Sequence, residues 1–83
     1  MASYVLLLKE HEDDNTVVYR FGPNEDIMGK IELNKTTKKF SELESLPDPT
    51  IPNKFYFDRA AQRLVVCLVR EGGIFPERTA FES

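Results

Sequence analysis

The chain of 83 residues contains one cysteine, one histidine and only four glycines. A single cysteine excludes an internal disulfide, and the position of Cys67 within an apolar stretch is typical of a small core residue in a reducing compartment. The apolar run near the N-terminus ends at Leu8 and is accompanied by neither a basic leader nor a cleavage site. It is too short for a signal peptide or a membrane span. We therefore expect a soluble, cytoplasmic protein that does not contact the membrane.

Patterns that mark catalytic sites are also lacking. The glycines do not have the spacing of a phosphate-binding loop, and no serine stands in a nucleophile elbow. His11 lies among the acidic residues of segment 10–14, and histidine, glutamate and aspartate side chains are common metal ligands. Consecutive residues of one loop cannot all face one ion, however. We expect no catalytic residue, no metal, no other cofactor and no enzymatic activity.

The composition predicts one domain that spans residues 1–83. Hydrophobic residues make up 41% of the chain, which is enough for one small core. The net charge of −3 makes the chain mildly acidic. That balance argues against non-specific binding to phosphate backbones and favours a basic partner.

The stretch 58–71 is the only long run with helical spacing. On a helical wheel most of its apolar residues and the preceding Phe57 form one broad face, with Cys67 at the edge; the residues of this face are Phe57, Ala60, Ala61, Leu64, Val65 and Leu68. Arg59, Arg63 and Arg70 share the opposite side. The helix begins at Asn53 or at Asp58, since either residue can cap it. The two glycines at 72–73 end it.

Four strands are expected before this helix, at 4–8, 16–21, 27–33 and 38–43. Alternation directs Val17, Tyr19 and Phe21 to the core and leaves Val18 and Met28 on the opposite, open face of the sheet. The spacing of the fourth strand predicts a bulge or an early end. Three prolines between 45 and 53 predict an extended connector. Residues 79–81 either add a short edge strand or only pack their phenylalanine.

Short loops favour antiparallel neighbours. We therefore predict an α+β fold of the order β-β-β-β-α: a four-stranded antiparallel meander with one helix across one face and a short extended C-terminal tail. The first and third loops of a meander lie at the same end. The acidic loop 11–15 is thus expected near the lysine-bearing turn 34–39, and the acidic loop 22–26 is expected alone at the far end.

Three short segments carry a resemblance to a known class of proteins. They are GKIELN at 29–34, FYFDRAA at 55–61 and EGGIFPERT at 71–79. With this layout, they resemble small bacterial immunity proteins of contact-dependent or polymorphic toxin systems. The resemblance implies a cytosolic inhibitor that neutralises a cognate toxin, often a basic nuclease, by direct binding. Immunity proteins share no common fold or binding residue, so it assigns no functional position.

Three functional hypotheses follow. The first is a protein-binding module that docks on a basic toxin through its acidic loops, because clustered carboxylates speed such docking; the residues expected to bind are Glu12, Asp13, Asp14, Glu25 and Asp26. The second is a nucleic-acid-binding or regulatory module that uses the arginine stripe of Arg59, Arg63 and Arg70. Overall acidity disfavours it. The third is an accessory subunit or homo-oligomer joined through the open sheet face or an edge strand; the sequence leaves the oligomeric state open.

Overall fold

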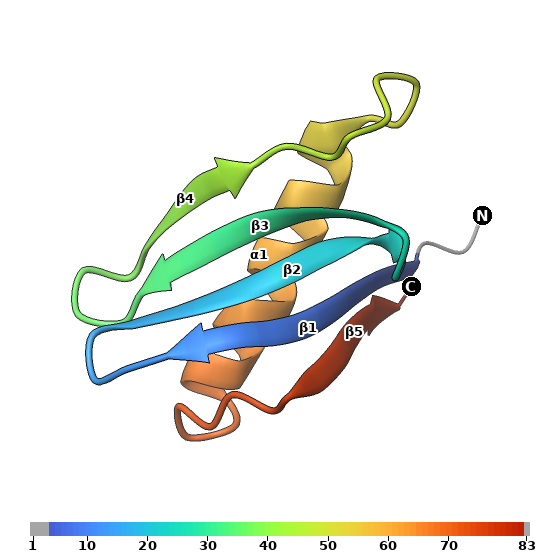
Figure 1. Cartoon of the computed structure of the whole chain (residues 1–83). Coiled ribbons are helices and arrows are strands. Elements are labelled where there is room, and N and C mark those ends of the chain that lie inside the picture. Colours follow the sequence, from blue (N-terminus) through green and yellow to red (C-terminus); the bar gives the residue numbers. More distant parts are fainter. Residues whose placement is uncertain (1–3, 83) are drawn as a thin grey trace.

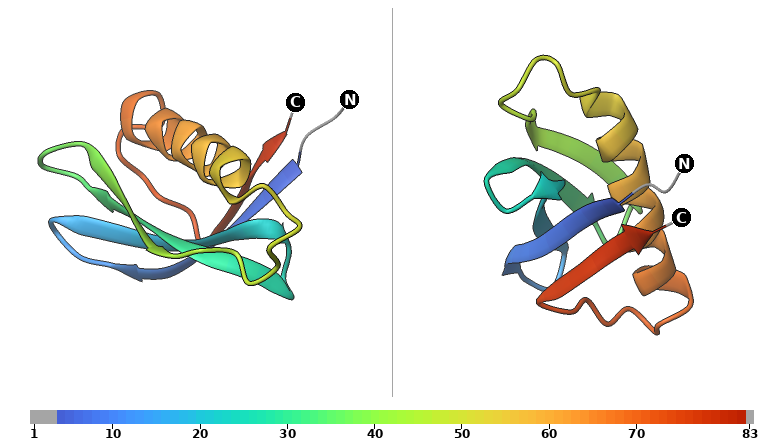
Figure 2. Two further views of the ribbon diagram at one scale, coloured as in Figure 1. Left: turned by 90° about the horizontal axis from the view of Figure 1, so that it is seen from above. Right: turned by 90° about the vertical axis from the view of Figure 1, so that its right-hand side faces the viewer.

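A computed structural model describes residues 4–82, so residues 1–3 and 83 of the expected domain lie outside the described part. Five antiparallel strands form one sheet in the order β4-β3-β2-β1-β5, and one helix packs across one of its faces (Figures 1 and 2). The predicted α+β meander with a covering helix is confirmed. The elements are β1 (Tyr4–Glu12), β2 (Thr16–Asn24), β3 (Ile27–Asn34), β4 (Lys39–Glu44), α1 (Asn53–Val69) and β5 (Arg78–Glu82).

The C-terminal tail is a fifth strand. β5 pairs antiparallel with β1, with Val5 opposite Phe81 and Leu7 opposite Thr79. The edge-strand alternative for the tail is therefore confirmed, and Phe81 also packs against the core. The first strand of the meander therefore has a paired strand on each side, and its Val5, Leu6 and Leu7 are all buried.

The core lies between the sheet and α1. Val17, Tyr19 and Phe21 of β2 are fully buried, as the alternation predicts. Phe21 meets Phe57 of α1 edge to face, with ring centroids 5.9 Å apart. Gly29 faces Phe21 across the β2–β3 pair, and a Cβ there would lie 3.1 Å from that ring. Glycine at this position therefore lets the large ring fill the core.

The helix begins at Asn53 and not at Asp58, with Pro52 at the N-cap position. Asn53 does not cap the helix, because its side chain accepts a hydrogen bond from the Leu46 N–H and donates one to Glu42. At the other end, Gly72 and Gly73 adopt φ values of 69° and 79°. The Gly73 N–H reaches back to the carbonyl of Cys67, so the glycines end the helix as expected.

The buried side of α1 is rotated from the face that the wheel predicts. Cys67, placed at the edge by the sequence, is fully buried with Ala60 and Leu64, whereas Val65 is 43% exposed. The physical reason is β5: the helix packs on β5, β1, β2 and β3, so the sheet extends under the Cys67 side and leaves the Val65 side uncovered.

The fourth strand carries the expected irregularity. The register of the β3–β4 pair shifts between Lys30 and Ile31, which leaves Leu43 out of the pairing and 49% exposed. No helix within residues 4–82 is long and apolar enough to cross a membrane.

Candidate functional site

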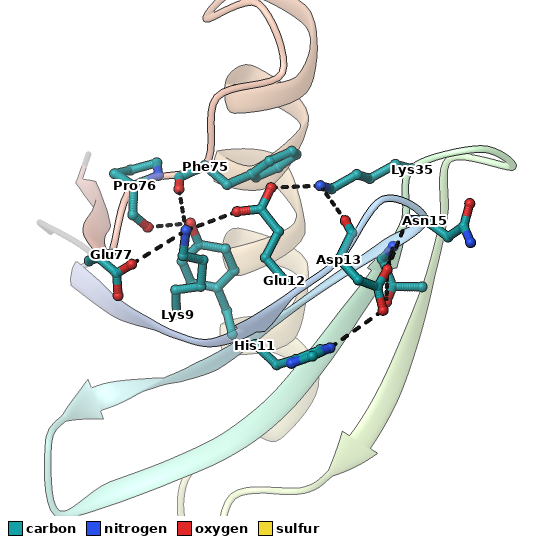
Figure 3. Close-up of polar contacts among 11 residues, drawn as sticks. Lys9, His11, Glu12, Asp13, Asn15, Lys35, Phe75, Pro76 and Glu77 are labelled. Carbon is teal, nitrogen blue, oxygen red and sulfur yellow. Dashed lines mark hydrogen bonds and ion pairs between the residues drawn. The ribbon is translucent and has the colours of Figure 1, made fainter.

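The β1–β2 loop and the β3–β4 turn meet at one end of the sheet, as predicted (Figure 3). The Lys35 ammonium donates to Glu12 Oε2 at 2.6 Å and to the carbonyl of Asp13 at 2.8 Å. The Lys35 backbone N–H also donates to the carbonyl of Asn15 at 2.7 Å. These bonds join residues that lie 20 to 23 positions apart in the chain, so the relative position of the two loops is well defined.

A third segment, residues 75–77, joins the same end, and the sequence did not predict it. The Lys9 ammonium lies 2.9 Å from the Phe75 carbonyl, 2.9 Å from Glu12 Oε1 and 3.5 Å from a carboxylate oxygen of Glu77 (Figure 3). The hydroxyl of buried Tyr19 donates to the carbonyl of Pro76. Lys9 and Tyr19 therefore hold the segment that leads from α1 into β5.

Glu12 is the centre of this network. Its carboxylate lies between the ammonium groups of Lys35 and Lys9, and it is only 27% exposed. Hydrogen bonds from Lys35 and then Lys9 lower the pKa of Glu12, and the bond to Glu12 raises the pKa of Lys9. Glu12, one of the residues expected to bind a partner, thus has a structural role in joining three segments.

Asp13 shapes the β1–β2 loop. Its Oδ1 accepts hydrogen bonds from the backbone N–H groups of Thr16 and Asn15, at 2.7 and 2.8 Å, and from the Thr16 hydroxyl. These bonds, led by the Thr16 N–H, lower the pKa of Asp13 to about 2. The carboxylate therefore stays ionised across the physiological range and presents a negative charge at the tip of the hairpin.

This turn predicts a loss of stability in acid. An unfolded aspartate has a pKa near 3.9, so the contribution of Asp13 is complete above about pH 4 and is lost as pH falls towards about 2. The Asp13→Asn variant keeps the acceptor oxygen but does not titrate. We expect its unfolding midpoint in urea to fall less than that of the wild type between pH 4 and pH 2. Parallel pH profiles for the two proteins would contradict this assignment.

The loops and the C-terminal segment surround an open hollow of about 580 Å³, which we call the acidic end. Its five carboxylates and two ammonium groups give a formal charge of −3 with histidine neutral, which equals that of the whole chain. Among residues 4–82, no group of three or more His, Cys, Asp or Glu side chains is arranged so that it could hold a metal ion. The residues of the acidic end are Lys9, Glu10, His11, Glu12, Asp13, Asp14, Lys35 and Glu77.

The second acidic loop lies at the opposite end of the strands (Figure 1). Asp26 is exposed there, but Glu25 forms an ion pair with Arg78 of β5 at 2.9 Å. The prediction that this loop stands alone is therefore wrong, because β5 brings an arginine to it. The structure separates Glu25 and Asp26 from the acidic end, so the five predicted acidic residues do not form one site.

Two of the three arginines of the helix already have partners within the chain. Arg59 stacks on Phe55, with its guanidinium 4.3 Å from the ring centroid, and also approaches Phe81. Arg63 donates to the Thr79 hydroxyl at 2.8 Å and forms an ion pair with Glu71. Arg70 is exposed at the end of the helix. Arg59 and Arg63 therefore face β5 and help to hold it.

The open face of the sheet is less apolar than the sequence suggested. Val18 is only 8% exposed, so it offers little contact area. Lys30 crosses this face and forms ion pairs with Glu10 at 2.9 Å and Glu44 at 3.2 Å. Val18 therefore adds little to the expected contact surface, whereas Met28 is partly exposed.

Fold and site together define a small α+β domain, with one helix on a five-stranded antiparallel sheet and a concentrated negative charge at one end. No family model, no curated protein and no solved structure matches the chain.

Proposed function

We propose that this protein is a small binding module whose acidic end docks on a basic protein, and that it acts as an immunity protein that neutralises a cognate bacterial toxin by direct binding. The observation that carries the proposal is the arrangement of the acidic end. Lys9, Glu12 and Lys35 tie three segments together, and the remaining carboxylates lie around this fixed centre. A negative surface of this kind steers a basic partner towards it.

Rigidity of the acidic end supports binding in a second way. A surface that is ordered before association loses less conformational entropy when the partner docks. Asp13 is held by three hydrogen bonds, while Glu77 is 86% exposed beside the Lys9 ammonium. A basic partner therefore meets the Asp13 carboxylate in a defined position and can approach the exposed Glu77.

The partner class comes from the resemblance to immunity proteins, and the charge supports it. Toxins of these systems are often basic nucleases, and a basic enzyme is the partner that the acidic end favours. The direct test is to co-express the chain with the toxin encoded beside its gene. We expect the chain to restore growth and to co-purify with the toxin. A neighbouring product that is not toxic, or a toxin that the chain does not bind, would contradict the proposal.

Reversing one charge at the acidic end tests the binding surface. The Asp14→Lys variant is expected to slow association with the basic partner by about three- to tenfold at low salt, and less at high salt, because steering depends on the local field. Association rates at both salt concentrations would be measured by surface plasmon resonance. The matched control is Asp26→Lys, which makes the same change in an exposed loop at the other end of the sheet. Equal effects of the two variants would rule out docking at the acidic end.

Nucleic-acid binding through Arg59, Arg63 and Arg70 is the second candidate. One observation favours it, namely that Arg59 and Arg63 lie on the same side of α1, beside β5, and that exposed Arg70 follows at the C-cap. Arg59 and Arg63 are already engaged within the chain, and the overall charge of −3 opposes a phosphate backbone. This alternative requires salt-dependent binding to DNA or RNA. A mobility-shift experiment without a complex at high micromolar protein would exclude it.

A further inference from the structure

The outer edge of β5 is an unpaired strand edge. β5 is the last strand of the sheet, and within residues 4–82 no strand lies on its other side (Figure 2). Its pairing with β1 is regular over all five residues. The opposite edge strand, β4, carries a register shift, and such irregularities discourage pairing with another chain. The β1–β5 pairing shows no such irregularity.

The backbone groups that face outward can be identified. The Lys9 N–H donates to the Glu77 carbonyl at 2.8 Å, so Lys9 and Glu77 are a hydrogen-bonded pair of the β1–β5 ladder. Such pairs alternate with non-bonded pairs along antiparallel strands. Thr79 and Phe81 therefore bond to β1 as well. The N–H and C=O groups of the alternate residues of β5 point to the free edge; these residues are Arg78, Ala80 and Glu82.

We infer that this edge pairs with the same edge of a second copy of the chain, about a two-fold axis at Ala80. In this register each outward-facing residue meets an outward-facing residue, so the backbone groups pair completely. Arg78 of each copy lies opposite Glu82 of the other, which gives two ion pairs of opposite charge. Ala80 meets Ala80, and its small side chain permits close approach.

The register is set by geometry as well as by charge. Residues that lie opposite each other in an antiparallel pair point to the same face of the sheet. When a two-fold axis relates the two strands, the sequence numbers of opposite residues must therefore differ by an even number. Shifting the centre one residue towards the N-terminus would bring Pro76 into the ladder, and proline cannot donate a hydrogen bond. The register centred on Ala80 is the one that uses the whole of β5.

Space beside this edge is open. A hollow of about 420 Å³ lies between α1 and the outer side of β5. In the pairing, Phe81 of the second copy lies opposite Thr79 on this helix-facing side, so the hollows of the two copies lie next to each other. The sheets of the two copies then form one continuous ten-stranded sheet with both helices on the same face. The residues that line the hollow are Gln62, Arg63, Val66, Ala80, Phe81 and Glu82.

Sedimentation velocity on the wild-type chain tests the association directly. Between about 5 and 500 μM we expect a reversible shift from monomer to dimer, with Kd in the micromolar range. A monomer at every concentration would overturn the inference, as would a trimer or an open-ended polymer. The measurement needs no toxin, so its result is separate from that of the proposed function.

Charge reversal identifies the edge. Arg78→Glu places like charges opposite each other twice in the dimer and should raise Kd about tenfold or more. Combining it with Glu82→Arg restores opposite charges, so the double variant should recover the wild-type Kd. Because Arg78 also pairs with Glu25 within the chain, Glu25→Gln is the control: it removes only the intrachain pair and should not raise Kd. If Arg78→Glu left Kd unchanged, or if the double variant had a Kd no lower than that of the single variant, the contact would lie elsewhere.

Hydrogen exchange gives a readout at each residue. The amides of Thr79 and Phe81 should be protected at all concentrations, because they bond to β1. Those of Arg78, Ala80 and Glu82 should exchange quickly in the monomer and become protected only as the dimer forms. Protection of all five amides at low concentration, or no change on raising it, would contradict the pairing.

Discussion

Replacing Leu64 with alanine should lower the free energy of unfolding by about 2–5 kcal/mol. Leu64 is fully buried, between Ala60 and Cys67 on the side of α1 that meets the sheet. The variant removes apolar contacts and leaves a cavity that the strands cannot fill without moving. Because domains of this kind are stable by only about 5–15 kcal/mol, a measurable part of the population would unfold at 37 °C. Urea denaturation followed by circular dichroism measures the change.

The adjacent residue provides the matched control. Val65 lay on the predicted apolar face together with Leu64, but it is 43% exposed in the structure. Val65→Ala should therefore cost less than about 1 kcal/mol, since surface substitutions change stability little. If Val65→Ala cost as much as Leu64→Ala, the helix would be packed as the wheel predicts, and the rotation towards Cys67 would be wrong.

Replacing Gly22 with alanine should destabilise the protein by about 3 kcal/mol, through a clash within the β2–β3 hairpin. A Cβ at Gly22 would lie 1.9 Å from the carbonyl oxygen of Ile27, which is a backbone atom and cannot rotate away. Relief requires the hairpin to open, at the point where the β2–β3 register shifts between Phe21 and Asn24. Urea denaturation measures the cost, and amide chemical shifts locate the movement in the hairpin.

Gly72 separates this steric effect from the general cost of replacing a glycine. A Cβ at Gly72 would meet nothing within 4 Å, and only its φ of +69° disfavours alanine. Gly72→Ala should therefore cost about 1–2 kcal/mol. A Gly22→Ala variant as stable as Gly72→Ala would mean that the hairpin adjusts freely, contrary to the close approach of its two strands.

Both proposals depend on the C-terminal segment, residues 75–82. Residues 75–77 complete the acidic end through Lys9 and Tyr19, and β5 supplies the edge for a second copy. Glu77, in the acidic end, directly precedes Arg78, the first residue of that edge. The sequence did not assign a binding role to this segment, because its residues show neither a helical period nor a long alternation.

The sequence by itself determined the elements and most of the orientation of their side chains. Alternation placed Tyr19 and Phe21 in the core, and short loops brought the acidic loop to the turn that contains Lys35. These features depend on local periodicity and on contacts between neighbours in the chain, and both can be read from residue spacing.

Only the tertiary structure decided the rest. It placed β5 beside β1, rotated α1 towards Cys67, put Glu12 between two lysines and separated Glu25 from the acidic end. Each of these features depends on contacts between residues far apart in the chain. Many charged side chains were available to pair, and their spacing does not say which ones meet. Strand pairing fixed that choice, because one added edge strand shifts the helix and brings Arg78 to Glu25.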